Sequence, residues 1–305
     1  MKYIVRKAVL APTPIIEIMA EEYSLLAKAR TTLVSALAME EKYEILIANY
    51  LALETSLLQI AASNTVRNTA SYSALFEVRS ALNVQLVNLL TAARLYLDQI
   101  CQEVADCLRG DASAADSVKA ECSRQYEKHF EYRFMEALRN HVQHRGIPIH
   151  YLGHLSQWTS FDEDGRMEFA VDIAALRQYL EEDKKFKKSV LAEMSERVDL
   201  VAACRRYIES LSEIHEFSRN LVSAATSNAR SRIEAVHRRY AEVWSESLVG
   251  LAASSIEDER ETSSIPLLLD WDDVLLELLQ RNTRLVNLRK RYVTGRTMED
   301  RKARS

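Results

Sequence analysis

The feature that most constrains the fold is a run of 95 residues, 15–109, that contains neither glycine nor proline. The whole chain of 305 residues has only six glycines and four prolines. Sheet-rich folds need turn residues far more often, which disfavours sandwiches, barrels and doubly wound sheets. Long helices, which glycine and proline would interrupt, are the structure that this stretch favours. We therefore expect an all-α fold.

Hydrophobic spacing divides the first half of the chain into three long helices. The first is predicted to begin at Pro14, a residue favoured at the first helical position, with a break near residues 31–32. The second is expected over about 74–108 and the third over about 118–144. Long helices joined by short polar loops are typical of an antiparallel helical bundle.

The pattern changes after the third predicted helix. Alternation of polar and apolar residues predicts one short β-hairpin near 155–173, and helical spacing then returns in a C-terminal extension. We place a domain boundary there. Residues 1–155 form the predicted bundle, and residues 156–305 form a helical region of unassigned role with an acidic linker and a basic tail.

Charge is balanced overall but uneven at the C-terminal end. The net charge is −4, which argues against a globally basic nucleic-acid binder. Residues 281–305 nevertheless hold nine lysines and arginines. If the partner is RNA, this tail is the segment to contact phosphates, and the candidates are Arg284, Arg289, Lys290 and Arg291. The alternatives are that these side chains pair with the acids of 257–277 or are simply solvated.

Cysteine usage and hydropathy bear on localisation. The four cysteines form no CxxC pair and no spacing that indicates a disulfide framework. The first 19 residues lack a clean apolar core with a small-residue cleavage site, and no uninterrupted apolar run approaches about 18 residues. We therefore expect a cytoplasmic protein that does not bind a membrane.

Motifs for common cofactors are missing, but histidines cluster. The sequence has no Walker loop, GxGxxG, HExxH, GxSxG or EF-hand, so no cofactor is expected. Four of the seven histidines lie within residues 141–154. His150 and His154 have the i,i+4 spacing of metal ligands on a helix, but Gly146 and Pro148 break the helix and no acids or cysteines complete a site nearby. A metal site is therefore disfavoured.

A second interpretation of this cluster starts from Arg139-Asn140-His141-Val142-Gln143-His144. This stretch resembles the motif of the HEPN superfamily, an arginine followed after four to six residues by a histidine. Four Arg/His pairs in the chain have this spacing, but only Arg139 and His144 have asparagine directly after the arginine and end a long predicted helix. The wider string EYRFMEALRNHVQHRGIPI is also similar to bacterial HEPN proteins, and the resemblance covers about 30–155.

The resemblance implies a metal-independent endoribonuclease. In that family His144 would take the proton of a ribose 2′-hydroxyl, Arg139 would hold the phosphate, and Asn140 would share the face of His144. Two motifs face each other in a HEPN homodimer, so a homodimer that acts on an RNA substrate is expected. HEPN ribonucleases serve as toxins or in phage defence, which adds an antitoxin or another regulatory protein as an expected partner.

Three further residues are candidates for supporting roles beside the motif. His141 lies within it, and Arg94 and Asp98 are polar positions on an otherwise apolar predicted helix. The i,i+4 spacing of Arg94 and Asp98 also fits a simple ion pair.

Blander interpretations of the motif remain open. His144 could cap a helix end while Arg139 pairs with Glu136 or Glu131. The chain could then be a non-catalytic helical dimerisation or interaction protein. A nucleotide-sensing regulator with a HEPN-like fold would use the same residues to line a pocket without turning over RNA.

Overall fold

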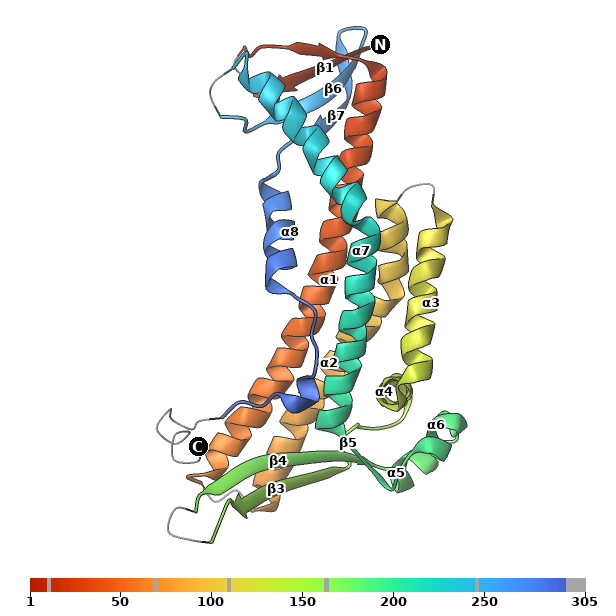
Figure 1. Cartoon of the computed structure of the whole chain (residues 1–305), viewed down its shortest axis with the longest axis vertical. Helices are drawn as coiled ribbons and strands as arrows, with labels where there is room; N and C mark the ends of the chain where they lie inside the picture. Colours follow the sequence, from red (N-terminus) through yellow and green to blue (C-terminus); the bar gives the residue numbers. More distant parts are fainter. Residues whose placement is uncertain (10–11, 68–70, 109–110, 162–164, 245–246, 295–305) are drawn as a thin grey trace. The chain divides into compact units, whose positions relative to one another are not determined.

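The computed structural model describes residues 1–9, 12–67, 71–108, 111–161, 165–244 and 247–294. Figure 1 shows its helices and strands. In chain order they are β1 (Lys2–Lys7), β2 (Ile16–Ile18), α1 (Ala20–Asn64), α2 (Tyr72–Cys107), α3 (Ala112–Lys128), α4 (Phe130–His144), β3 (Tyr151–Trp158), β4 (Met167–Leu176), α5 (Arg177–Glu181), α6 (Lys188–Glu193), β5 (Arg197–Asp199), α7 (Leu200–Ala241), β6 (Leu251–Glu257), β7 (Arg260–Pro266), α8 (Asp270–Arg281) and the 3₁₀ turn η1 (Leu288–Lys290).

The prediction of an all-α fold is wrong. The protein is mixed α/β, with 64% helix and 16% strand. One antiparallel sheet has the order β2-β1-β6-β7, and a second has the order β3-β4-β5. The hairpin expected near 155–173 is present as β3 and β4, which pair from Tyr151 opposite Ala174 to Trp158 opposite Met167. Its expected turn is the Asp-Glu-Asp-Gly stretch 162–165, of which residues 162–164 lie outside the described part of the chain.

The four-stranded sheet is not predicted by the sequence, because the turn of its β6–β7 hairpin lacks glycine. The β6–β7 hairpin turns through Asp258 and Glu259, which both have positive φ, 47° and 63°. This is the backbone of a type I′ turn, in which glycine or asparagine is usual. The segment interpreted as an acidic linker is therefore a hairpin. On the side away from β7, strand β6 pairs with β1, so that Val5 lies opposite Ala253. These two residues are nearly the whole length of the chain apart in sequence.

This turn predicts a stabilising substitution. Glu259→Gly removes the steric cost of a side chain at positive φ and should raise the free energy of unfolding by about 0.5–1 kcal/mol. The matched control is Glu257→Gly in strand β6, where glycine should lower stability by a similar amount. Urea denaturation of both variants measures the difference, and a destabilised Glu259→Gly variant would contradict the turn geometry.

The helices also differ from their predicted bounds. Residues 16–18 form β2, so α1 begins at Ala20 rather than Pro14, with Glu21 and Glu22 in its first turn. Acidic side chains at that position stabilise the helix N-terminus. No break occurs near 31–32, because α1 runs unbroken to Asn64. The third predicted helix is divided into α3 and α4 at His129, whose backbone is extended.

The chain divides into two compact units, each made of three stretches. Helices α1, α2, α3 and α7 contribute residues to both units, so the units differ from the division predicted near residue 155. The first unit comprises 1–48, 92–124 and 214–283, and the second comprises 49–91, 125–213 and 284–305.

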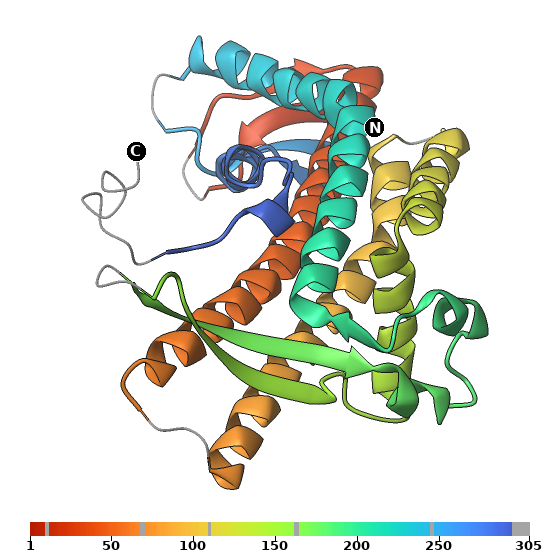
Figure 2. The same cartoon turned by 60° about the horizontal axis from the view of Figure 1, so that its bottom comes forward.

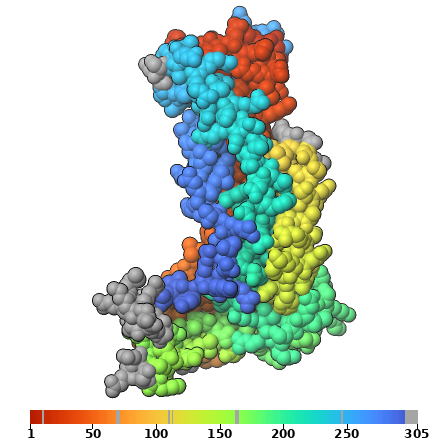
Figure 3. Space-filling view, viewed as in Figure 1, coloured from red at the N-terminus to blue at the C-terminus, as the bar shows by residue number. Residues whose placement is uncertain are grey.

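The core of the first unit lies between its sheet and two helices. Val5, Leu251 and Ala253 of the sheet are buried against Leu26 and Leu33 of α1 and against residues of α7. The α7 residues in this core are Ala229, Ile233, Val236 and Tyr240. Their three-to-four spacing places them on one face of the helix. The side chains of α8 (blue) lie against those of α7 (teal) in Figure 3. Between these helices, Arg230 of α7 donates a hydrogen bond to Asp272 of α8 (2.6 Å).

The second unit carries the three-stranded sheet and the helices after it. Figure 2 brings the β3–β4 hairpin forward, with α5 and α6 following β4. Helix α6 contacts α4. The buried face of α4 is made of Tyr132, Phe134, Met135, Ala137, Leu138 and His141. His141 is the only polar residue on that face, which makes its surroundings the starting point for the site.

Helix α1 is long and apolar enough, by length and composition alone, to cross a membrane. The core helix of a soluble protein passes the same test, so this observation is weak evidence for either location. Localisation in the cytoplasm therefore stays a prediction.

Candidate functional site

The last turn of α4 carries the predicted motif and ends in a tight backbone arrangement. The carbonyl of His141 accepts hydrogen bonds from the N–H groups of Arg145 (2.8 Å) and Gly146 (3.3 Å). Glycine at 146 is required by a close approach, since a Cβ atom there would come within 2.8 Å of Nε2 of His141. At the end of α4, the backbone of Arg145 and Gly146 therefore folds back toward His141, and Gly146 lies against its imidazole ring.

A cavity of about 450 Å³ opens beside this helix end, entirely within the second unit. Helix α4 lines it with Glu136, Ala137, Asn140, His141 and His144. The loop between α5 and α6 adds Asp183, Lys185, Phe186 and Lys187, and α3 adds Tyr126. The volume is in the usual range for a small-molecule site.

His141 and Asp183 form a buried pair at the wall of this cavity. Nδ1–H of His141 donates to Oδ2 of Asp183 (2.8 Å), and the two side chains are 7% and 4% exposed. The N–H of Lys185 donates to Oδ1 of the same carboxylate (3.0 Å), and Nε of Arg145 lies 3.6 Å from it. The hydrogen bond from His141 holds the pKa of Asp183 below its ordinary value against the opposing effect of burial. Asp183 is therefore an ionised group that fixes the orientation of the ring.

The other ring nitrogen of His141 has no such partner. Among the described residues none is hydrogen-bonded to Nε2, and Nε2 is not one of the fully buried unpartnered atoms. With the proton on Nδ1, Nε2 carries the lone pair. The neutral ring in this tautomer therefore has one oriented proton acceptor, Nε2, which lies beside Gly146.

The charged side chains that line the cavity are two lysines, Lys185 and Lys187, and two carboxylates, Asp183 and Glu136. Lys187 donates to the hydroxyl of Tyr126, and its ammonium lies 4.7 Å from the centre of the Tyr126 ring. Lys185 is exposed, and Glu136 is engaged by the hydroxyl of Tyr207. Asp183 is bound by His141 and Glu136 by Tyr207, so the two ammonium groups are the charged groups that can contact an anion such as a phosphate, and an aromatic ring suits a base.

Not every residue of the predicted motif lines the cavity. Asn140 and His144 are exposed and line the cavity together with His141. Arg139 does not line it, and its Nη1 donates instead to Oδ1 of Asn140 (3.0 Å). The cations that do line the cavity, Lys185 and Lys187, were not identified in the sequence. They lie within the charged stretch 181–188, whose position in space no local pattern reveals.

The supporting candidates Arg94 and Asp98 lie in the first unit. Nε of Arg94 donates to Oδ2 of Asp98 (2.8 Å) along the surface of α2, and both side chains are well exposed. They do not line the cavity, which belongs to the second unit. The i,i+4 ion pair accounts for their spacing.

The basic tail is partly engaged by acids outside the acidic segment. Arg284 lies 3.7 Å from Glu213, and Arg289 lies 3.3 Å from Glu131. Lys290 and Arg291 are exposed at the end of η1. The rest of the predicted RNA-contacting tail, 295–305, lies outside the described residues.

The other candidate for the histidine cluster was a metal site. Nδ1 of His150 accepts a hydrogen bond from the N–H of Leu176 (3.0 Å), and burial lowers the pKa of His150 to about 4. Within the described ranges, no group of three or more histidine, cysteine or acidic side chains is placed to hold a metal ion. His150 is thus a neutral structural residue beside β4.

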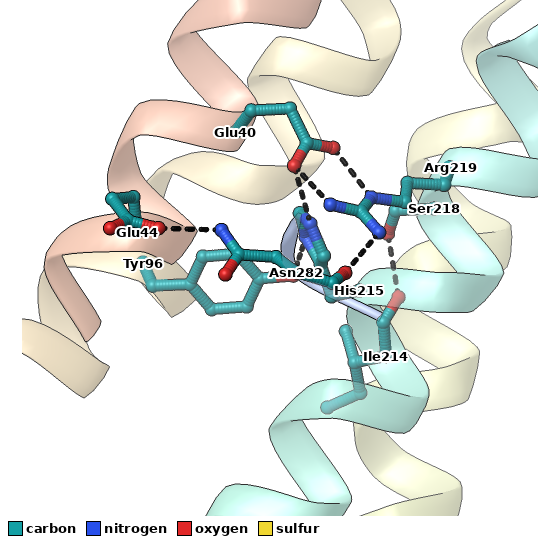
Figure 4. Close-up of polar contacts among 8 residues, drawn as sticks. All are labelled: Glu40, Glu44, Tyr96, Ile214, His215, Ser218, Arg219 and Asn282. Carbon is teal, nitrogen blue, oxygen red and sulfur yellow. Dashed lines mark hydrogen bonds and ion pairs between the residues drawn. The ribbon is translucent and has the colours of Figure 1, made fainter. Parts of the chain in front are cut away.

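A second polar cluster, in the first unit, had no signal in the sequence. Nε2 of His215 lies 3.1 Å from Oε2 of Glu40, and its Nδ1 lies 3.1 Å from the Tyr96 hydroxyl (Figure 4). Arg219 donates from Nε to Oε1 of Glu40 (2.7 Å) and from Nη1 to the carbonyl of Asn282 (2.5 Å). Glu40 is completely buried. The cluster joins α1 and α7 to the end of α8 and has a structural role.

Burial and hydrogen bonds together determine which groups of this cluster are protonated. Burial acts to raise the pKa of Glu40, but hydrogen bonds from Arg219 and His215 outweigh it and hold the pKa below its ordinary value. Burial lowers the pKa of His215, although the hydrogen bond to Glu40 acts in the opposite direction. The cluster therefore contains an ionised carboxylate and a neutral imidazole at neutral pH.

These two pKa shifts predict that the folded protein loses stability in acid. The pKa of His215 is lower in the folded protein than in the unfolded chain, where it is about 6.5, so below that pH the unfolded chain binds more protons at His215. The pKa of Glu40 is also lower in the folded protein, and the same difference appears as the pH falls through about 4.5. Acid therefore favours unfolding at both groups. Stability should fall from pH 7 to pH 5, and one such histidine contributes up to about 1.4 kcal/mol per pH unit. Urea denaturation at several pH values should show a smaller slope for His215→Gln. An unchanged slope in that variant would contradict the neutral assignment.

No protein-family model, curated protein or solved structure matches this chain. The geometry of the cavity and the motif that lines it are therefore the basis for a functional proposal.

Proposed function

We propose that the protein is a HEPN-like, metal-independent endoribonuclease whose active site is the cavity at the end of α4. The observation that carries this proposal is the convergence of His144, Asn140, an oriented His141 and two lysines on one cavity. The toxin or phage-defence role expected from the resemblance, with an antitoxin or other regulator in the cytoplasm, is part of the same proposal.

The chemistry needs only groups that the cavity supplies. An imidazole such as His144 exchanges protons with ribose and leaving-group oxygens near neutral pH. In this proposal Lys185 and Lys187, which line the cavity, hold the scissile phosphate and stabilise the charge that develops on it. The lysines thereby take the phosphate-holding role that the resemblance assigns to Arg139.

A homodimer is also proposed, supported by exposed apolar side chains on two helices of the second unit. Leu51 and Leu58 of α1 are 62% and 42% exposed, and their seven-residue spacing places them on one face. Tyr72 and Phe76 of α2, spaced i,i+4, are 84% and 52% exposed. Exposed apolar surface of this kind is a frequent mark of a protein interface.

One observation favours a second candidate function. The cavity has the volume, the lysines and the Tyr126 ring that a free nucleotide would need. A nucleotide-sensing regulator would therefore bind at the same place but would not turn RNA over.

Incubation of the purified protein with total RNA in excess EDTA separates the two functions. Progressive cleavage in EDTA is the result expected of the proposed ribonuclease. Tight nucleotide binding with intact RNA would favour the sensor, and cleavage that appears only after a divalent metal is added would contradict metal independence.

A further inference from the structure

Two histidines of one chain meet at the same cavity, and this permits a step beyond the proposed function. We infer that His141 and His144 are the acid–base pair of a complete active site within a single chain, with Asp183 as the positioning residue. This inference rests on the proposed ribonuclease activity. It differs from the family arrangement used in the sequence analysis, in which the acid and the base come from two copies of the motif across a dimer axis.

The surroundings of His141 assign it the role of base. Its Nδ1–H is bound to the ionised Asp183, so Nε2 is left with its lone pair and without a partner among the described residues. A carboxylate behind the ring stabilises the imidazolium that forms when Nε2 takes a proton. Asp183 is itself held by the N–H of Lys185, so the ring orientation is fixed before substrate arrives.

His144 has the complementary surroundings. It lies three residues after His141, so the two project from neighbouring positions of one helix face, and both line the cavity. Its side chain is exposed, and none of the described residues is hydrogen-bonded to it. An exposed imidazole can take a proton from solvent and deliver it to a leaving group.

The cleavage step balances with these two groups alone. The ribose 2′-oxygen attacks the adjacent phosphorus while Nε2 of His141 takes the 2′-hydroxyl proton. The bond between phosphorus and the 5′-oxygen breaks, and protonated His144 gives that oxygen its proton. The products are a 2′,3′-cyclic phosphate and a 5′-hydroxyl. His141 ends protonated and His144 neutral, and exchange of one proton each with water restores both.

The first test compares histidine variants on a fluorescent single-stranded oligoribonucleotide of about 20 residues in EDTA, a length that covers a typical single-strand site. We expect His141→Ala to lose about 100-fold or more in cleavage rate, as general acid–base catalysis requires. His154→Ala, a histidine of β3 that does not line the cavity, is the matched control and should keep wild-type activity. Added imidazole should restore part of the rate to His141→Gly, which shows that the loss is catalytic rather than a folding defect.

The second test asks whether one chain is sufficient. Mixed dimers of a wild-type chain and a His141→Ala/His144→Ala chain, separated by two affinity tags, should keep about half of the wild-type rate because one site is intact. A site shared across the dimer would lose nearly all activity. Full activity of a monomeric wild-type protein would also support a single-chain site.

The positioning role of Asp183 has its own readout. Asp183→Asn should lower kcat while leaving KM for the oligonucleotide nearly unchanged, and Asp183→Glu should recover part of kcat. ¹⁵N NMR should show that His141 loses its Nδ1–H tautomer in Asp183→Asn.

The outcomes separate the two levels of the proposal. Absence of RNA cleavage by the wild type would overturn the proposed function and this inference together. Wild-type cleavage that survives in His141→Ala, or that vanishes in the mixed dimer, would overturn this inference alone.

Discussion

Replacement of His144 by alanine is expected to lower the rate of RNA cleavage by about 10²–10⁴-fold, the usual contribution of one general acid–base group. His144 is exposed and lines the cavity, so its removal leaves no buried group without a partner and the fold should be unaffected. Single-turnover cleavage with enzyme in excess measures the chemical step apart from product release.

The control for this substitution is Gln143→Ala, an exposed neighbour on the same turn of α4 that does not line the cavity. It should cleave at the wild-type rate. Equal rates for His144→Ala and Gln143→Ala would exclude His144 from the chemistry, and circular dichroism should show the same unfolding temperature for both variants.

Replacement of Glu40 by alanine should have the largest effect on stability, a loss of about 3–5 kcal/mol in the free energy of unfolding. Glu40 is fully buried and is bound by both Arg219 and His215. Its removal leaves the largely buried Arg219 guanidinium without its carboxylate, which costs far more than loss of a surface ion pair. Urea denaturation measures the loss.

Glu41→Ala is the matched control, because Glu41 is the exposed neighbour on the same helix. It should change stability by less than about 0.5 kcal/mol. A Glu40→Ala variant as stable as Glu41→Ala would show that the buried cluster does not hold α1 against α7.

The sequence predicted the helices of this chain better than its sheets, for a physical reason. The 95-residue stretch without glycine or proline does form long helices, α1 and α2. The same argument wrongly excluded the four-stranded sheet, because Asp258 and Glu259 make its hairpin turn without glycine. Strand β1 is a single six-residue segment, and its partner β6 follows about 250 residues later, so no local pattern pairs the two strands.

The residues of the candidate site also fall into two groups, those that local sequence spacing predicts and those that depend on tertiary packing. Asn140, His141 and His144 lie on one helix, so local spacing was sufficient to bring them together. Asp183, Lys185 and Lys187 reach the cavity through the loop between α5 and α6, and that contact depends on tertiary packing. The pair of Glu40 and His215, 175 residues apart, shows the same dependence in the first unit.

The chemistry of the new RNA ends tests the central claim most directly. Mass spectrometry of an oligoribonucleotide cleaved by the wild-type protein in EDTA should find a 2′,3′-cyclic phosphate on one product and a 5′-hydroxyl on the other. These ends are the products of attack by the ribose 2′-oxygen, and their absence from a matched digest with His144→Ala would assign the proton transfer to the cavity. Products with a 3′-hydroxyl and a 5′-phosphate, or no products at all, would contradict the account.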